Sequence, residues 1–147
     1  MSENANIKTF YIGTLITSVV GGILLLFTDF AGWDGSNAYL GIYSWGYIGS
    51  NLDNPLSIIP FLILACMLFY CAYVSYLGFS KEVPKELINR SFLFSAIVFA
   101  IVVFGALFFI ISISTEDVWW WMDAGFYGGF IGSGLSTLFL YQIKKSI

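Results

Sequence analysis

The hydrophobic positions of this chain form four long runs separated by shorter polar segments. The runs cover about 9–29, 55–79, 87–113 and 116–143. As a helix, each run is long enough to cross the roughly 30 Å of hydrocarbon in a bilayer. We therefore expect an all-α integral membrane protein with one domain over 1–147, a four-transmembrane-helix bundle. An outer loop would span 30–54, and a short inner loop 80–86.

Composition supports a membrane environment. Hydrophobic residues make up 59% of the chain and charged residues only 10%, and the mean hydropathy is +0.85. A soluble domain carries about a quarter charged residues, so this chain would lack a polar coat. A cleaved signal peptide is the rival interpretation of the first run, but the run is long and only Lys8 precedes it as a basic residue.

The charges divide between the two ends of the predicted helices. One end holds every basic residue of the chain: Lys8, Lys81, Lys85, Arg90, Lys144 and Lys145. The other end holds only acids: Asp29, Asp34, Asp53, Glu116, Asp117 and Asp123. Basic residues favour the cytoplasmic side, so we expect a multi-pass cell-membrane protein whose N- and C-termini are both cytoplasmic.

Small residues mark two helix faces. In the last helix they share a sector of about 100° and resemble an extended GxxxG pattern: Gly125, Gly128, Gly129, Gly132 and Ser136. In the first helix they repeat every four residues: Thr14, Ser18 and Gly22. We expect both faces to be close-packing sites, facing each other or the helices of other molecules.

The outer loop is rich in aromatic residues. Trp33 begins it, and Tyr43, Trp45 and Tyr47 occupy alternate positions in its centre. Such alternation predicts a strand or short hairpin. An irregular segment at the headgroup level is the alternative, and the five glycines of the loop favour it slightly.

Three consecutive tryptophans, Trp119, Trp120 and Trp121, stand at the predicted start of the last helix. Tryptophans at a membrane boundary usually anchor a helix end as an aromatic belt. A cluster of three could also bind a partner protein, because tryptophan is enriched at the energetic centres of protein interfaces.

Two acids, Asp29 and Asp123, each lie 21 residues from a basic residue of the inner boundary. Both should therefore sit about 31 Å from that boundary, near the outer edge of the membrane. They form a candidate cation site, and the simpler interpretation is that each side chain reaches water at a helix end. On a continuous helix, Asp123 would point away from the glycines and toward Trp119.

Residues for bond-making chemistry are scarce. The chain has no histidine, which removes the commonest general base and a common metal ligand. Cys66 and Cys71 lie in an apolar run and are expected to be small buried residues. We expect no cofactor, no metal and no enzymatic activity.

Asp53, Asn54 and Pro55 predict the start of the second helix.

Four crossings, cytoplasmic ends, Trp33 and the segment 41–45 together resemble the claudin and peripheral-myelin-protein type of tetraspan. The outer cysteine pair of that family is absent, and the second outer loop here is shorter. The resemblance implies lateral assembly or cell-surface contact through the outer loops.

We therefore expect a structural or accessory membrane subunit that assembles with other membrane proteins or with itself. Its contacts would be the small-residue helix faces and the aromatic outer end. Its surroundings are the lipid bilayer, and no nucleic acid is expected. The alternative is a small oligomeric ion channel or transporter with an acidic outer vestibule. Hydroxyl residues are the only polar side chains near mid-membrane, which disfavours this alternative.

Overall fold

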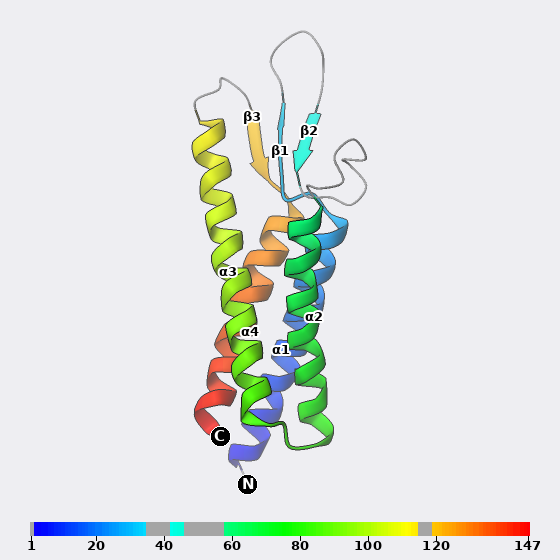
Figure 1. Ribbon diagram of the computed structural model, residues 1–147, viewed down its shortest axis with the longest axis vertical. Coiled ribbons are helices and arrows are strands. Elements are labelled where there is room, and N and C mark those ends of the chain that lie inside the picture. The colour runs from blue at the N-terminus through cyan, green and yellow to red at the C-terminus, as the bar shows by residue number, and fades with distance from the viewer. Residues whose placement is uncertain (1, 35–41, 46–57, 115–118) are drawn as a thin grey trace.

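The computed structural model describes residues 2–34, 42–45, 58–114 and 119–147. Within these ranges the chain forms four helices and three short strands (Figure 1). The helices are α1 (Ser2–Phe27), α2 (Ile59–Ser80), α3 (Lys85–Ile113) and α4 (Ala124–Ser146). The strands are β1 (Ala31–Asp34), β2 (Ile42–Trp45) and β3 (Trp119–Met122).

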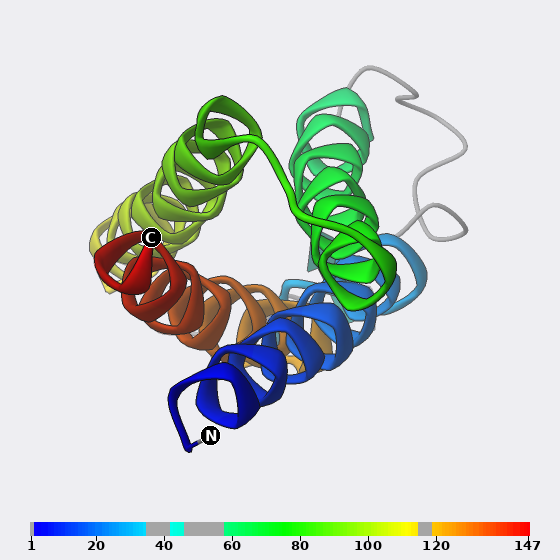
Figure 2. The ribbon, with the colours of Figure 1, turned by 90° about the horizontal axis from the view of Figure 1, so that it is seen from below.

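The four helices stand side by side in a ring. Helix α1 packs against α2 and α4, and α3 packs against the same two neighbours from the other side (Figure 2). The contact between α1 and α4 is the most extensive, and that between α2 and α3 is the least. Helix α1 begins and α4 ends at the same end of the bundle, which we name the terminal end (Figure 1).

Three of the helices, α1 from Asn6 onward, α2 and α3, are long and apolar enough to cross a membrane. Helix α4 is not among them, although its 23 residues extend over about 35 Å. All six basic residues of the chain lie at the terminal end, in the first turns of α1 and α3 or at the last turns of α2 and α4.

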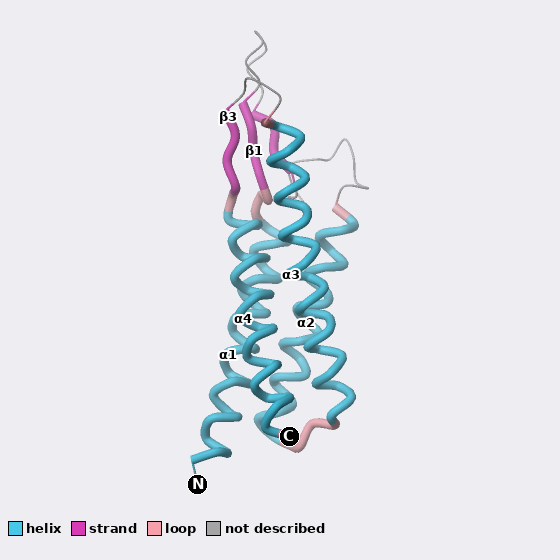
Figure 3. Tube along the Cα trace, turned by 90° about the vertical axis from the view of Figure 1, so that its left-hand side faces the viewer, coloured by secondary structure: helices cyan, strands magenta, loops and turns pink. Residues whose placement is uncertain are grey.

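The strands form one antiparallel sheet at the opposite end of the bundle, which we name the sheet end (Figure 3). The strand order is β2-β1-β3, so β1 lies in the centre. Trp33 is opposite Tyr43 on one side and opposite Trp120 on the other. The hairpin alternative for the outer loop is therefore confirmed for the residues of β1 and β2.

The predicted start of the last helix is wrong. The last helix begins at Ala124 rather than near 116, because Trp119 to Met122 form a strand paired with β1. Aromatic side chains fit a half-exposed pleated surface, which explains why this run accepts the strand. The second helix begins at Ile59, with Pro60 in its first turn. The predicted start at Asp53–Pro55 lies outside the described residues.

The interior of the bundle changes character along its length. Near the sheet end an apolar cluster fills it, including Leu25, Phe61, Leu68, Val102 and Phe109. A second cluster near the terminal end includes Tyr11, Cys71, Ile88, Leu140 and Ile143. Among the residues whose burial is described, the buried polar side chains are all hydroxyls, contributed by all four helices: Thr14, Ser18, Ser75, Ser91, Ser95, Ser133 and Ser136.

Candidate interaction surface at the sheet end

The sheet is fixed to the bundle where α1 ends and α4 begins. The backbone N–H of Asp123 donates to the carbonyl oxygen of Phe30 at 3.0 Å, and that of Gly125 donates to Asp29 at 2.9 Å. A Cβ on Gly125 would lie 2.7 Å from the same Asp29 oxygen, closer than van der Waals contact allows. Glycine is therefore required for α4 to start directly against the end of α1.

One face of the sheet packs toward the helices. Trp33 and Trp120 are cross-strand neighbours, and each ring contacts Phe109 of α3, with centroids 5.9 Å and 6.1 Å away. Phe109 is buried in the apolar cluster near the sheet end, and Trp33 and Met122 pack against that cluster. These aromatic contacts hold the sheet against the last turns of α3.

The other face carries Trp119 and Trp121, since successive side chains of a strand alternate in direction. Trp121 lies over Gly32, where a Cβ would be 2.5 Å from its ring. Its exposure, 36%, is close to the 38% of Trp120, whereas Trp119 is 84% exposed. A tryptophan this exposed contributes little to the chain's own packing. We define the Trp119 and Trp121 side chains on β3 as the tryptophan face.

The remaining predicted aromatics lie in or beyond the second strand. Tyr43 and Trp45 belong to β2, opposite Trp33 and Ala31 of β1. Tyr47 lies outside the described residues. The structure thus brings Trp33, Tyr43, Trp45 and the three tryptophans of β3 into a single sheet, although they come from two separate connections of the chain.

The predicted small-residue faces meet inside the chain. Gly132 lies against Gly21 and Thr17 of α1, and Gly128 lies against Leu24. The Ser136 hydroxyl oxygen is 2.8 Å from both the Thr17 and the Ser18 hydroxyl oxygens. Gly129 faces both Leu25 and Val102 of α3.

The α1 side of this seam differs from the prediction by one position. Gly21 faces α4, whereas Gly22 faces the ring of Phe69 on α2. Thr14 is buried and donates to the carbonyl of Phe10 in its own helix. Gly13, Thr17 and Gly21 of α1 therefore meet α4, with Gly13 against Phe139, and of the predicted series Ser18 also reaches α4 through its hydroxyl. The series that begins at Gly13 was missed because it runs parallel to the predicted one, one residue earlier.

The two acids of the candidate cation site both lie where the chain leaving α1 meets the start of α4. Asp29 accepts a hydrogen bond from Gly125 through its main chain, and Asp123 precedes Gly125 by two residues. The Asp123 carboxylate accepts from the Ala124 N–H at 2.6 Å, which makes it the N-cap of α4. Because Asp123 precedes α4, the continuous helix on which its predicted direction was based does not form there. Among the described residues, no group of three or more possible ligands could hold a metal ion.

No family model, curated protein or solved structure matches this chain. Its function is therefore inferred from the arrangement of its own side chains.

The two cysteines have different environments. Cys71 is buried, and its thiol donates to the carbonyl oxygen of Ser91 at 3.2 Å. Cys66 is exposed on the outside of α2, so the prediction that it is buried is wrong. The two residues are five positions apart, which places them on different sides of the helix.

Proposed function

We propose that this protein is a non-enzymatic, four-crossing membrane protein that serves as a structural or accessory subunit. Its sheet end would bind another membrane protein through the tryptophan face. Both termini would lie in the cytoplasm. The observation that carries this proposal is the 84% exposure of Trp119 on a strand that is itself ordered by pairing with β1.

A tryptophan held on a paired strand is well suited to binding. Its backbone is already fixed, so little conformational entropy is lost when a partner covers the ring. Large aromatic side chains dominate the energetics of protein interfaces. Strand β3 is also at the edge of the sheet, where backbone groups not used by β1 can pair with a partner strand.

The small-residue faces are less suited to an external partner. Gly128 and Gly132 of α4 lie against α1, and Gly125 lies against Thr28 and Asp29 just beyond its end, so their close-approach surface is already occupied. We therefore assign the partner contact to the tryptophan face and assign the seam between α1 and α4 to the stability of the bundle.

The packing of α4 supports a fourth crossing. Helix α4 lies between α1 and α3 and contacts both, so a bilayer that surrounds those two helices would also surround α4. Its last turn carries Lys144 and Lys145 beside the other basic residues of the terminal end. This charge distribution supports a cytoplasmic location for both termini.

An ion channel through the bundle is the weaker candidate. A cation entering at the sheet end would meet Leu25, Phe61, Leu64, Leu68 and Val102, all buried in one apolar cluster. Moving an ion through such a dry segment without compensating polar groups is costly. The hydroxyl side chains lie farther toward the terminal end.

The test is the mass of the native particle after extraction in a mild detergent. We expect the wild-type chain of 16.4 kDa to elute with larger, different subunits, and a Trp119→Ser, Trp121→Ser double variant to elute without them. Tyr76→Ser is the matched control, because Tyr76 is 59% exposed on α2 near the terminal end. Recovery of the wild-type chain alone would contradict the proposal.

A further inference from the structure

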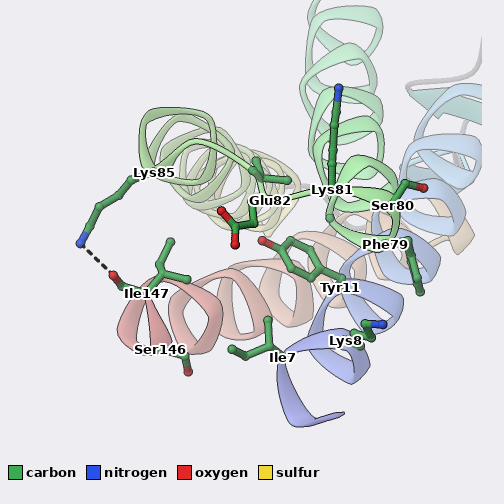
Figure 4. Close-up of a pocket in the computed structure, with 12 residues that line it drawn as sticks. Ile7, Lys8, Tyr11, Phe79, Ser80, Lys81, Glu82, Lys85, Ser146 and Ile147 are labelled. Carbon is green, nitrogen blue, oxygen red and sulfur yellow. Dashed lines mark hydrogen bonds between the residues drawn. The ribbon is translucent and has the colours of Figure 1, made fainter. Parts of the chain in front are cut away.

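A cavity of about 670 Å³ opens at the terminal end of the bundle. Its walls come from the first turns of α1, the end of α2, the connection to α3 and the last residues of α4 (Figure 4). It is far from the tryptophan face, at the opposite end of the molecule. The proposed subunit function does not use it.

Lysines surround this cavity. Lys8 comes from α1, Lys81 from the end of α2 and Lys85 from the first turn of α3. Figure 4 shows the three side chains on different sides of the opening, with the ammonium groups of Lys81 and Lys85 directed away from its centre. Lys85 donates to the carbonyl oxygen of Ile147 at 3.5 Å. All three are exposed, so their flexible stems can turn toward a bound anion.

One acid opposes these lysines. The Glu82 carboxylate and the Tyr11 hydroxyl point toward each other near the centre of the cavity (Figure 4). Lys85 is already engaged by the Ile147 oxygen, so Lys8 and Lys81 are the ammonium groups left to face the Glu82 carboxylate, and the lining stays positive. The site therefore favours an anion, and Glu82 lowers the affinity for it by repulsion.

The walls between the charged groups are apolar. Ile7, Phe79 and Val83 contribute to them. The ring of Tyr11 lies directly on Gly78, where a Cβ would be 2.5 Å away. Glycine at this position therefore leaves the ring room to form part of the wall. A ligand that fills the cavity must combine negative charge with apolar surface.

The position of the cavity suits one class of amphipathic anion. Lys8 and Lys81 lie at the ends of two helices that are long and apolar enough to cross a membrane. Phospholipid headgroups lie at this depth, and basic pockets between transmembrane helices bind anionic headgroups. A soluble phosphate ion would use the lysines but gain nothing from the apolar walls.

We propose that this cavity binds the headgroup of an anionic phospholipid from the leaflet at the terminal end. Lys8 and Lys81 contact the phosphate, and Ile7, Phe79 and Val83 pack against the glycerol and the first methylenes of the acyl chains. Lys85 adds a third positive charge at the rim.

Native mass spectrometry of the full chain in detergent, titrated with phosphatidylglycerol, tests this site. The variant is the double substitution Lys8→Gln, Lys81→Gln. The matched control is Lys144→Gln, Lys145→Gln, which removes the same charge from the same end at residues that do not line the cavity. All four side chains are exposed, so both variants should fold, which size-exclusion chromatography would confirm.

We expect the cavity variant to bind phosphatidylglycerol about tenfold more weakly or worse, since each lysine near a headgroup contributes substantially to binding. The control should lose less than half of its affinity, and Glu82→Gln should bind more tightly than the wild type. If both double lysine variants lost the same affinity for phosphatidylglycerol, the binding would be due to general surface charge and the proposed site would be wrong. Equal binding of phosphatidylcholine would overturn the role of the anion. Equal binding of glycerol 3-phosphate would overturn the lipid in favour of a soluble phosphate.

Discussion

Gly21 on α1 and Gly132 on α4 lie directly against each other: a Cβ on Gly132 would be 2.7 Å from the Cα of Gly21 and 2.8 Å from the Thr17 carbonyl oxygen. Both neighbouring atoms belong to the backbone, so neither can move aside without displacing a helix. This contact fixes how closely the two most extensively packed helices approach.

We expect Gly132→Ala to destabilise the bundle by about 1–3 kcal/mol, because overpacking forces α1 and α4 apart. Gly134→Ala is the control on the same helix. A Cβ there would lie 3.2 Å from the ring of Phe99, and the removal of a helical glycine should be neutral or slightly stabilising. Thermal unfolding in detergent, followed by circular dichroism, compares the two. Equal melting temperatures would mean that the seam is not tightly packed.

The hydroxyl of Ser136 joins Thr17 and Ser18 across the same seam. Ser136→Ala should lower the free energy of unfolding by about 0.6–2 kcal/mol, the range for polar side-chain contacts between transmembrane helices. In the Ser136→Ala variant, Ser18→Ala should lower the free energy of unfolding by less than it does in the wild type, because both substitutions remove the same bond. Ser146→Ala, at an exposed position, is the control. Additive effects would show that the two hydroxyls act independently.

Phe109 and Phe108 are neighbours on α3 with opposite environments. Phe109 is buried against Trp33 and Trp120, whereas Phe108 is 70% exposed. Phe109→Ala should cost about 3–5 kcal/mol and loosen the sheet from the helices. Phe108→Ala should be close to neutral. Chemical unfolding followed by tryptophan fluorescence measures the free energy of unfolding of each variant. Similar losses in the two variants would contradict the described packing.

The two cysteines should react differently with a small apolar maleimide in the folded protein. One thiol of the two should label, because Cys66 is exposed and Cys71 is buried. Cys66→Ala should abolish this labelling, and Cys71→Ala should leave it unchanged. After unfolding in sodium dodecyl sulfate, both thiols of the wild type should react. Labelling of Cys71 in the folded chain would contradict its burial.

The proposed fourth crossing predicts on which side of the membrane each of three engineered cysteines lies, in a chain from which the two native cysteines have been removed. An impermeant maleimide applied to intact cells should label Ser114→Cys, at the sheet end. It should reach Asn6→Cys and Ser146→Cys only after the membrane is opened, because positive residues retain both termini inside. Opposite compartments for the Asn6 and Ser146 variants would rule out four crossings.

Hydrophobic runs predicted the four helices because the length of an apolar segment is a local property. Strand β3 could not be predicted in this way. Three tryptophans at a membrane boundary suit a helix end as well as a strand, and the choice depends on β1, which is more than 80 residues away in the sequence. Pairing over such a separation is determined by tertiary contacts rather than by local preference.

The glycines of α4 were predicted on one face, and the structure places Gly128 and Gly132 against α1 and Gly125 against the residues just beyond its end. The opposing residues on α1 were displaced by one position. Small residues recur there in two adjacent four-residue series, beginning at Gly13 and at Thr14. Both satisfy the same spacing rule. The position of α2, whose Phe69 covers Gly22, determines that Gly21 rather than Gly22 meets α4.

The central strand of the sheet follows α1 directly, whereas β3 precedes α4. During synthesis β1 therefore emerges long before the strand that completes the sheet. The bonds from Asp123 to Phe30 and from Gly125 to Asp29 can form only after the last helix has entered the bundle. Completion of the sheet thus reports that the helical bundle is complete, and the proposed partner surface, which includes β3, would form only on fully assembled molecules.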